Sequence, residues 1–177
     1  MSKSKMTKAK GYSLWLMPTG DVYRRLSGVI LKLSEKHSTP RFEPHITLLP
    51  EIGGLSEDAI VEKTLQLSRI VSPFEIRLTH VNYLDQYFRC VFLRAEETTE
   101  LKNANYKAQE IFGRLQDLKF MPHLSLMYGN LTPETKEQII ETIGREFNVI
   151  FNVANIHLFS TEGEPKDWHI IKEFELK

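Results

Sequence analysis

The sequence has almost no cysteine, no net charge and no long hydrophobic run. Cys90 is the single cysteine among 177 residues, which excludes an intrachain disulfide and a cysteine-based zinc site. Basic and acidic residues each number 23, so no net field draws the chain to a nucleic-acid backbone or an anionic membrane. No apolar stretch reaches the roughly 20 residues that span a bilayer. We therefore expect a cytoplasmic protein with a buried thiol, binding a small ligand through a few local groups.

The chain divides into a short basic start and one long globular part. Residues 1–10 are lysine-rich with no apolar segment after them, which predicts a disordered tail and not a signal peptide. Residues 11–177 contain no Gly/Ser-rich linker, and the composition of 41% hydrophobic and 26% charged residues is typical of a globular domain. We expect a single two-lobed domain there.

Hydrophobic periodicity and turn residues predict a mixed α+β fold. Strands are expected over residues 12–17, 45–49, 73–84, 87–95, 123–127, 147–159 and 168–176, and helices over 21–37, 56–69, 98–115 and 133–145. The alternation in the strand over 73–84 changes phase near Thr79, which indicates a β-bulge or a switch of the buried face. A turn at Asp85 and Gln86 predicts a hairpin, so the sheets should be mostly antiparallel with the helices outside.

A seven-residue repeat is the most informative feature. Residues 42–48 read FEPHITL and residues 120–126 read FMPHLSL, so Phe-x-Pro-His-apolar-hydroxyl-Leu recurs 78 positions apart. Each copy is followed by a predicted helix and then a strand. This pattern indicates an internal duplication.

The spacing within the repeat separates a polar face from an apolar face. Residues two apart in a strand point to the same side, so His45 and Thr47 share one face, as do His123 and Ser125. The intervening apolar residues point the other way, into a core. If the two copies face each other about a pseudo-twofold axis, two imidazoles and two hydroxyls meet in one cleft.

Two imidazoles and two hydroxyls suit displacement at phosphorus. In-line attack needs a base on the water and an acid on the leaving oxygen, and imidazole, with an ordinary pKa of about 6.5, can serve as either. The hydroxyls of Thr47 and Ser125 can donate to the non-bridging oxygens. We predict His45 and His123 as the catalytic pair, with no metal and no cofactor.

At these residues the chain resembles the 2H phosphoesterase superfamily, which is defined by paired His-x-Thr/Ser motifs. It is most similar to the plant and yeast type of cyclic phosphodiesterase, through the segments YSLW (12–15), PRFEPH (40–45), CVFL (90–93) and MPHLSLMY (121–128). The resemblance implies a duplicated, two-lobed, LigT-like fold with antiparallel sheets around a central cleft. It also implies hydrolysis of ADP-ribose 1'',2''-cyclic phosphate and nucleoside 2',3'-cyclic phosphates, the latter to 2'-phosphates. We expect the protein to be a monomer.

The resemblance implies further site residues. Tyr128 matches a tyrosine whose hydroxyl reaches the phosphate, although strict alternation from His123 places it on the opposite face unless Gly129 allows a twist. Trp15 and Phe88 match aromatic positions that flank the site and can stack on a base or ribose, but core packing explains them equally well. Trp168 is predicted to be structural, in the last strand.

Three alternatives remain open from the sequence. An enzyme of the same superfamily could act on RNA 2',3'-cyclic phosphate ends or join 2'–5' ends, although the neutral charge argues against a long RNA substrate. A nucleotide-binding module without turnover would share the fold. A two-histidine metal site is disfavoured because neither motif has a carboxylate at ligand spacing apart from Glu43, which precedes Pro44 and should point away from the neighbours of His45.

Overall fold

The computed structural model describes residues 10–117 and 119–177, so nearly all of the predicted tail lies outside the described residues. The described chain has eight strands, four α-helices and two short 3₁₀-helices. In chain order they are β1 (Tyr12–Leu16), α1 (Gly20–His37), β2 (Ile46–Ile52), α2 (Glu57–Ser68), β3 (Phe74–Asn82), η1 (Tyr87–Arg89), β4 (Val91–Ala95), α3 (Thr99–Phe112), β5 (His123–Met127), α4 (Pro133–Ile143), β6 (Glu146–Val153), β7 (Asn155–Ser160), η2 (Pro165–Asp167) and β8 (His169–Glu175).

The strands form one curled sheet with the order β6-β3-β4-β5-β2-β1-β7-β8, and every recorded pairing is antiparallel. The two motif strands, β2 and β5, are neighbours at its centre. On either side the order is symmetric, because β1 and β4 come next, then β7 and β3, and then the edges β8 and β6. We call β2-β1-β7-β8 the β1 lobe and β5-β4-β3-β6 the β4 lobe. The predicted α+β, two-lobed architecture is confirmed.

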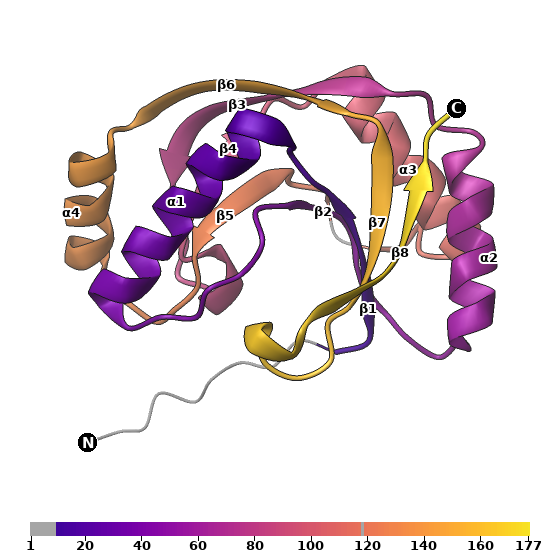
Figure 1. The fold of residues 1–177 in the computed structure, drawn as a ribbon, viewed down its shortest axis with the longest axis horizontal. Helices are drawn as coiled ribbons and strands as arrows, with labels where there is room; N and C mark the ends of the chain where they lie inside the picture. The colour runs from indigo at the N-terminus through magenta and orange to yellow at the C-terminus, as the bar shows by residue number, and fades with distance from the viewer. Residues whose placement is uncertain (1–9, 118) are drawn as a thin grey trace.

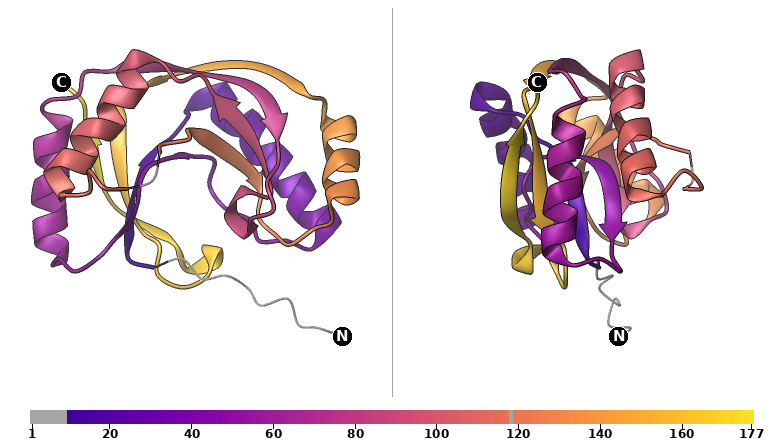
Figure 2. Two further views of the ribbon diagram at one scale, coloured as in Figure 1. Left: turned by 180° about the vertical axis from the view of Figure 1, so that it is seen from behind. Right: turned by 90° about the vertical axis from the view of Figure 1, so that its right-hand side faces the viewer.

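The helices cover the outside of the curved sheet in two groups. α1 and α4 lie at one end of the molecule and α2 and α3 at the other, with the arched sheet between them (Figures 1 and 2). α1 contacts β5 and β6, whereas α3 contacts β2 and β3, so each reaches strands of the opposite half of the chain. Side-chain oxygens of Ser56, Thr98 and Thr132 accept hydrogen bonds from the backbone three residues on, which explains where α2, α3 and α4 begin.

The predicted phase change at Thr79 is confirmed. The register of β3 shifts between Leu78 and His80 against β6, and between Leu78 and Val81 against β4. The irregularity lets one strand pair on both sides while it bends around the cleft.

The largest differences from the predicted boundaries are in three segments. The segment 147–159 is two strands, because the chain turns at Ala154 and passes from β6 in the β4 lobe to β7 in the β1 lobe. Residues 87–89 form η1, and the strand begins only at Val91. α3 ends at Phe112 and not at 115, because Gly113 takes a left-handed conformation with φ of +67° that ends the helix.

The apolar side of the repeat is buried as the spacing predicts. Ile46, Leu48, Leu124 and Leu126 have no exposed surface, and Cys90 is also buried. At about 2 kcal/mol or more for each fully buried branched side chain, this layer holds the two motif strands in place. No helix within the described residues is long and apolar enough to cross a membrane.

Candidate active site

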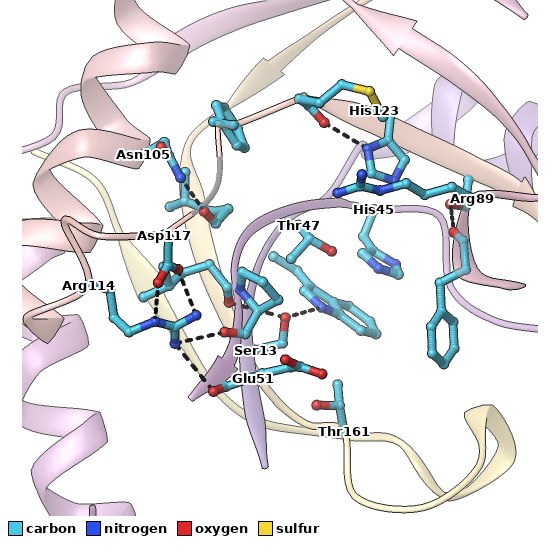
Figure 3. A pocket seen from close by; sticks show the side chains of 18 of the residues that line it. Ser13, His45, Thr47, Glu51, Arg89, Asn105, Arg114, Asp117, His123 and Thr161 are labelled. Atoms are coloured by element: carbon cyan, nitrogen blue, oxygen red, sulfur yellow. Dashed lines mark hydrogen bonds and ion pairs between the residues drawn. The ribbon is translucent and has the colours of Figure 1, made fainter. Parts of the chain in front are cut away.

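A cleft of about 560 Å³ lies where the two lobes meet. Side chains from both copies of the repeat line it, including His45, Thr47, His123 and Ser125 (Figure 3). The structure therefore brings together the four residues that the spacing placed on two polar faces.

The strand register explains why the four side chains meet. Ile46 pairs with Leu124 in an antiparallel register, so Thr47 lies opposite His123 and His45 lies opposite Ser125. Ile46 and Leu124 point into the core, and alternation turns the residues on both sides of them toward the cleft. His45 lies just before β2, whereas the prediction placed it inside the strand.

Both imidazoles are oriented by the same local device. Nδ1 of His45 lies 2.7 Å from the carbonyl oxygen of Glu43, and Nδ1 of His123 lies 2.8 Å from that of Met121. A carbonyl oxygen can only accept, so Nδ1 carries the hydrogen in each neutral ring. The prolines at 44 and 122 keep the preceding residues extended and so present these carbonyls. Each ring is left with an unprotonated Nε2 for the cleft, where it can accept or, once protonated, donate.

Burial keeps both rings neutral in the free protein. It lowers the pKa of His45 to about 3, an effect that the Glu43 carbonyl opposes and the charge of His123 reinforces. It lowers the pKa of His123 to about 4, opposed by the Met121 carbonyl and reinforced by Arg89 and Arg94. The two histidines are electrostatically coupled, so a proton on one disfavours a proton on the other.

The two hydroxyls of the repeat differ in their contacts. Ser125 is buried, and its Oγ donates to the carbonyl oxygen of Phe88 at 2.9 Å. Thr47 is half-buried in the cleft lining, and within the described residues its hydroxyl has no recorded partner. Thr47 can therefore donate to a ligand directly, whereas the Ser125 hydrogen is already used to fix η1.

Aromatic side chains line one side of the cleft. Trp15 stacks on His45 with ring centroids 3.5 Å apart, and its other contacts include Phe159 at 3.8 Å. Tyr128 stacks on Phe42, and its ring lies 5.1 Å from that of Phe88. Because β5 ends at Met127, strict alternation no longer applies at Tyr128, which reaches the cleft after all. Burial, and secondarily Tyr87, raise the Tyr128 pKa well above its usual value, so its hydroxyl remains a neutral donor.

Trp168 also lines this aromatic side, between Trp15, Phe88 and Tyr128, with centroid distances of 5.9–6.0 Å. It follows η2 and precedes β8, so its predicted place in the last strand is wrong. Its indole nitrogen is buried, with no hydrogen-bond partner among the described residues.

Several cleft residues were missed from the sequence. Asn105 is buried and its amide donates to the Leu48 carbonyl at 2.9 Å. It lies on the apolar side of α3, among Leu101, Ala104 and Ala108, and an amide in such a stripe is a signal that could have been read. Arg89 gave no such signal beyond its place next to Phe88. Ser13 and Thr161, which also line the cleft, gave none.

Among the residues that the structure describes, no three His, Cys, Asp or Glu side chains gather as metal ligands would. His80 is exposed on β3, and the Nε2 atom of His157 on β7 lies 3.7 Å from a carboxylate oxygen of Glu173. Neither lines the cleft.

The profile of a family described as "Cyclic phosphodiesterase-like protein" matches residues 10–176, which is nearly the whole chain. The chain belongs to the cyclic phosphodiesterase-like family. This is a hydrolase family within the 2H phosphoesterase superfamily. The chain is 28% identical over 159 residues to the cyclic phosphodiesterase of Arabidopsis thaliana, covering 88% of this chain and 87% of that protein. It is also 28% identical over 145 residues to the 2',3'-cyclic-nucleotide 3'-phosphodiesterase of Yarrowia lipolytica, covering 76% of this chain and 64% of that one.

Solved structures show the same fold. The protein TT0787 of Thermus thermophilus superimposes with a TM-score of 0.67 at 20% identity, over 94% of this chain and 97% of that one. Escherichia coli LigT complexed with 3'-AMP gives a TM-score of 0.65 at 15% identity, over 96% and 99%. The cyclic phosphodiesterase-like chain is thus a LigT-like 2H phosphoesterase in architecture.

Proposed function

We propose that this chain is a metal-independent hydrolase of ADP-ribose 1'',2''-cyclic phosphate and nucleoside 2',3'-cyclic phosphates, with His45 and His123 as its acid–base pair. The observation that carries the proposal is the matched orientation of the two rings. Each donates from Nδ1 to the carbonyl two residues earlier and presents Nε2 to the same cleft.

The chemistry requires one neutral and one protonated imidazole. The neutral ring takes a proton from water as the water oxygen bonds to phosphorus. The protonated ring gives its proton to the leaving oxygen as the other phosphorus–oxygen bond breaks. For a nucleoside 2',3'-cyclic phosphate that gives a 2'-phosphate, the leaving oxygen is the 3' oxygen. The bound phosphate anion raises the pKa of both rings from their low values and so supplies the protonated member of the pair.

The remaining cleft residues have separate roles in this proposal. The hydroxyls of Thr47 and Tyr128 donate to the non-bridging oxygens. Ser125 borders the phosphate site, and its hydroxyl acts on the site by holding η1 through the Phe88 carbonyl. Trp15 holds the His45 ring by stacking, and because it is buried and also stacks on Phe159 it acts as a positioning residue and not as a surface for the base. The half-buried ring of Phe88 is the apolar surface against which a base or ribose can lie.

The deciding experiment is an assay of the purified protein on both substrate types, with product analysis by phosphorus NMR. We expect turnover of both, retention of phosphate on the 2' oxygen of the nucleotide product, and full activity in the presence of EDTA. Loss of activity with EDTA, or no turnover of either substrate, would contradict the proposal.

The similarity to a cyclic phosphodiesterase and to a 2',3'-cyclic-nucleotide 3'-phosphodiesterase favours small cyclic nucleotides as substrates. A LigT-like enzyme that acts on RNA ends is the second candidate. Comparing kcat/KM for a mononucleotide 2',3'-cyclic phosphate with that for an RNA oligomer ending in the same group separates the two. We expect the mononucleotide to be at least as good a substrate. Higher kcat/KM for the oligomer, rising with its length, would favour the RNA enzyme.

The proposed setting is a monomer in the cytoplasm. The single domain over 11–177 supports it, since one chain supplies every residue of the cleft. Cys90 is a free thiol, as is usual in a reducing compartment.

A further inference from the structure

Among the described residues that line the cleft, Arg89 is the one partly buried cation without a carboxylate partner. Three cations line it, Arg89, Arg114 and Lys119. Arg114 lies 2.7 Å from Asp117 and donates to the carbonyls of Pro50 and Glu51, so its donors are already engaged. Lys119 is exposed to solvent. Arg89, by contrast, forms no ion pair with any described carboxylate.

Arg89 is fixed close to His123 by the backbone of η1. The carbonyl of Arg89 accepts from the Leu84 amide at 2.9 Å, and its own amide donates to the Gln86 carbonyl at 3.1 Å. One turn of η1 is further held by Gly129, whose amide donates to the Tyr87 carbonyl at 3.0 Å. Figure 3 shows the guanidinium of Arg89 extending toward the His123 imidazole.

Ser125 connects this arginine to the phosphate site. Its hydroxyl hydrogen goes to the Phe88 carbonyl within η1, so the hydroxyl supports the turn that carries Arg89. The hydroxyl hydrogen of Thr47 is available to a ligand in the cleft, whereas that of Ser125 is donated to the Phe88 carbonyl. On the Ser125 side the donor left for a phosphate between the two imidazoles is the neutral Tyr128 hydroxyl, and a guanidinium beside His123 can add two charged donors.

The histidines do not supply the missing charge. Both are neutral in the free cleft at pH 7, so neither attracts an anion before it binds. Burial, and secondarily Arg94, lower the pKa of the Arg89 guanidinium, yet an arginine stays protonated at neutral pH. A half-buried cation without a counter-ion is costly unless a ligand neutralises it.

We propose that Arg89 is the anion anchor of the cleft and binds the non-bridging oxygens of the phosphoryl group beside His123. The inference rests on the proposed function for the identity of the substrate but not for the binding of phosphate. It assigns the first electrostatic contact of the substrate to η1, outside the duplicated motif.

Arg94 provides a matched control. It is an arginine on β4 whose register partner is His123, and its charge also lowers the pKa of that ring. It is paired with Glu97 at 3.3 Å and does not line the cleft. Arg89→Gln and Arg94→Gln therefore remove equal charge near the same imidazole, but only the first removes the proposed contact.

The test is calorimetric titration of the wild type and both variants with inorganic phosphate and with adenosine 2'-monophosphate, at low and high salt. We expect Arg89→Gln to lower the affinity for both ligands about tenfold or more and to reduce the salt dependence of that affinity. Arg94→Gln should stay within about twofold of the wild type, and Arg89→Lys should fall between. Equal effects of the two glutamine variants, no effect of Arg89→Gln, or no binding of either ligand by the wild type would overturn the anchor.

The phosphate titration separates this inference from the proposed function. If the wild type hydrolyses no cyclic phosphate but binds phosphate through Arg89, the anchor stands and the proposed reaction fails. If it hydrolyses cyclic nucleotides and Arg89→Gln retains the wild-type affinity, the reaction stands and the anchor fails. Both variants change a partly exposed side chain, so thermal unfolding should show each folded as the wild type is.

Discussion

The indole of Trp15 lies flat against the imidazole of His45, with centroids 3.5 Å apart and planes 5° from parallel. A protonated imidazole in such contact quenches indole fluorescence, so Trp15 can report the protonation of His45. Trp15 is itself fixed, because its Nε1 donates to Ser13 Oγ at 2.9 Å and its ring also stacks on Phe159.

The first prediction uses this contact. In a Trp168→Phe variant, Trp15 is the only tryptophan. Because burial lowers the pKa of His45 to about 3, the fluorescence of Trp15 should show no quenching step between pH 5.5 and 7.5. The same variant with His45→Asn serves as the control. A step near pH 6.5 that His45→Asn removes would show that His45 titrates as an ordinary surface histidine.

The second prediction concerns acid stability. A histidine whose pKa is lower in the folded than in the unfolded protein contributes stability above the unfolded pKa of about 6.5 that is lost as the pH falls toward the folded pKa. With the folded pKa of His45 at about 3, the contribution of this residue should lower the free energy of unfolding by about 2 kcal/mol when the pH falls from 7 to 5. Urea unfolding of the wild type and His45→Asn at pH 7 and pH 5 measures it. Equal pH dependence of the two would contradict the low pKa.

The third prediction concerns the pH dependence of turnover. kcat/KM reports the free enzyme, in which the productive form carries one proton on two rings with pKa values of about 3 and 4. Its value should therefore fall with rising pH between about 5 and 7, approaching tenfold per unit. The profile of kcat should lie at higher pH, since the bound anion raises both pKa values. A kcat/KM maximum near 6.5 would mean that burial does not control these rings.

The fourth prediction compares the two histidines with a third. His45→Ala and His123→Ala should each lower kcat by about 10²–10⁴-fold, the usual contribution of a general acid or base. His80→Ala, on the exposed side of β3, should leave it unchanged. Full turnover in either cleft variant would exclude that ring from the chemistry.

The fifth prediction separates the two hydroxyls. Ser125→Ala leaves the buried Phe88 carbonyl without its donor and should lower the free energy of unfolding by about 1–2 kcal/mol as well as lowering kcat. Thr47→Ala should lower kcat with little change in stability, because its hydroxyl has no recorded partner in the described chain. Urea unfolding and steady-state kinetics on the two variants would show the difference. Equal loss of stability would contradict it.

The repeat made the centre of the site predictable. Two strands with identical patterns and buried Ile46 and Leu124 can meet in few ways, and antiparallel pairing at those residues puts His45, Thr47, His123 and Ser125 on one face. The core positions followed for the same reason, since period-two alternation assigns each residue to a side.

The rest of the cleft depends on tertiary contacts that local patterns do not encode. The turn at Ala154 carries no glycine or proline, so the sequence from 147 to 159 resembled one strand. Arg89 comes from a 3₁₀ turn held by hydrogen bonds to Leu84, Gln86 and Ser125. Trp168 is placed by η2, a feature of three residues. Short irregular segments of this kind are specified by what surrounds them.

The chain passes from one lobe to the other at β3 and again at β7, so the β1 lobe is built from two separate segments. The first half of the chain supplies β1 and β2 to one side of the sheet, but β3, which follows them, pairs with β4 and β6 on the other. β7 follows β6 of the β4 lobe in the chain but lies in the β1 lobe, where it pairs with β1. A fragment ending near residue 85 would leave β3 with neither neighbour and β1 with one bare edge. Neither half of the chain should therefore fold alone, because each supplies strands that pair with strands of the other half.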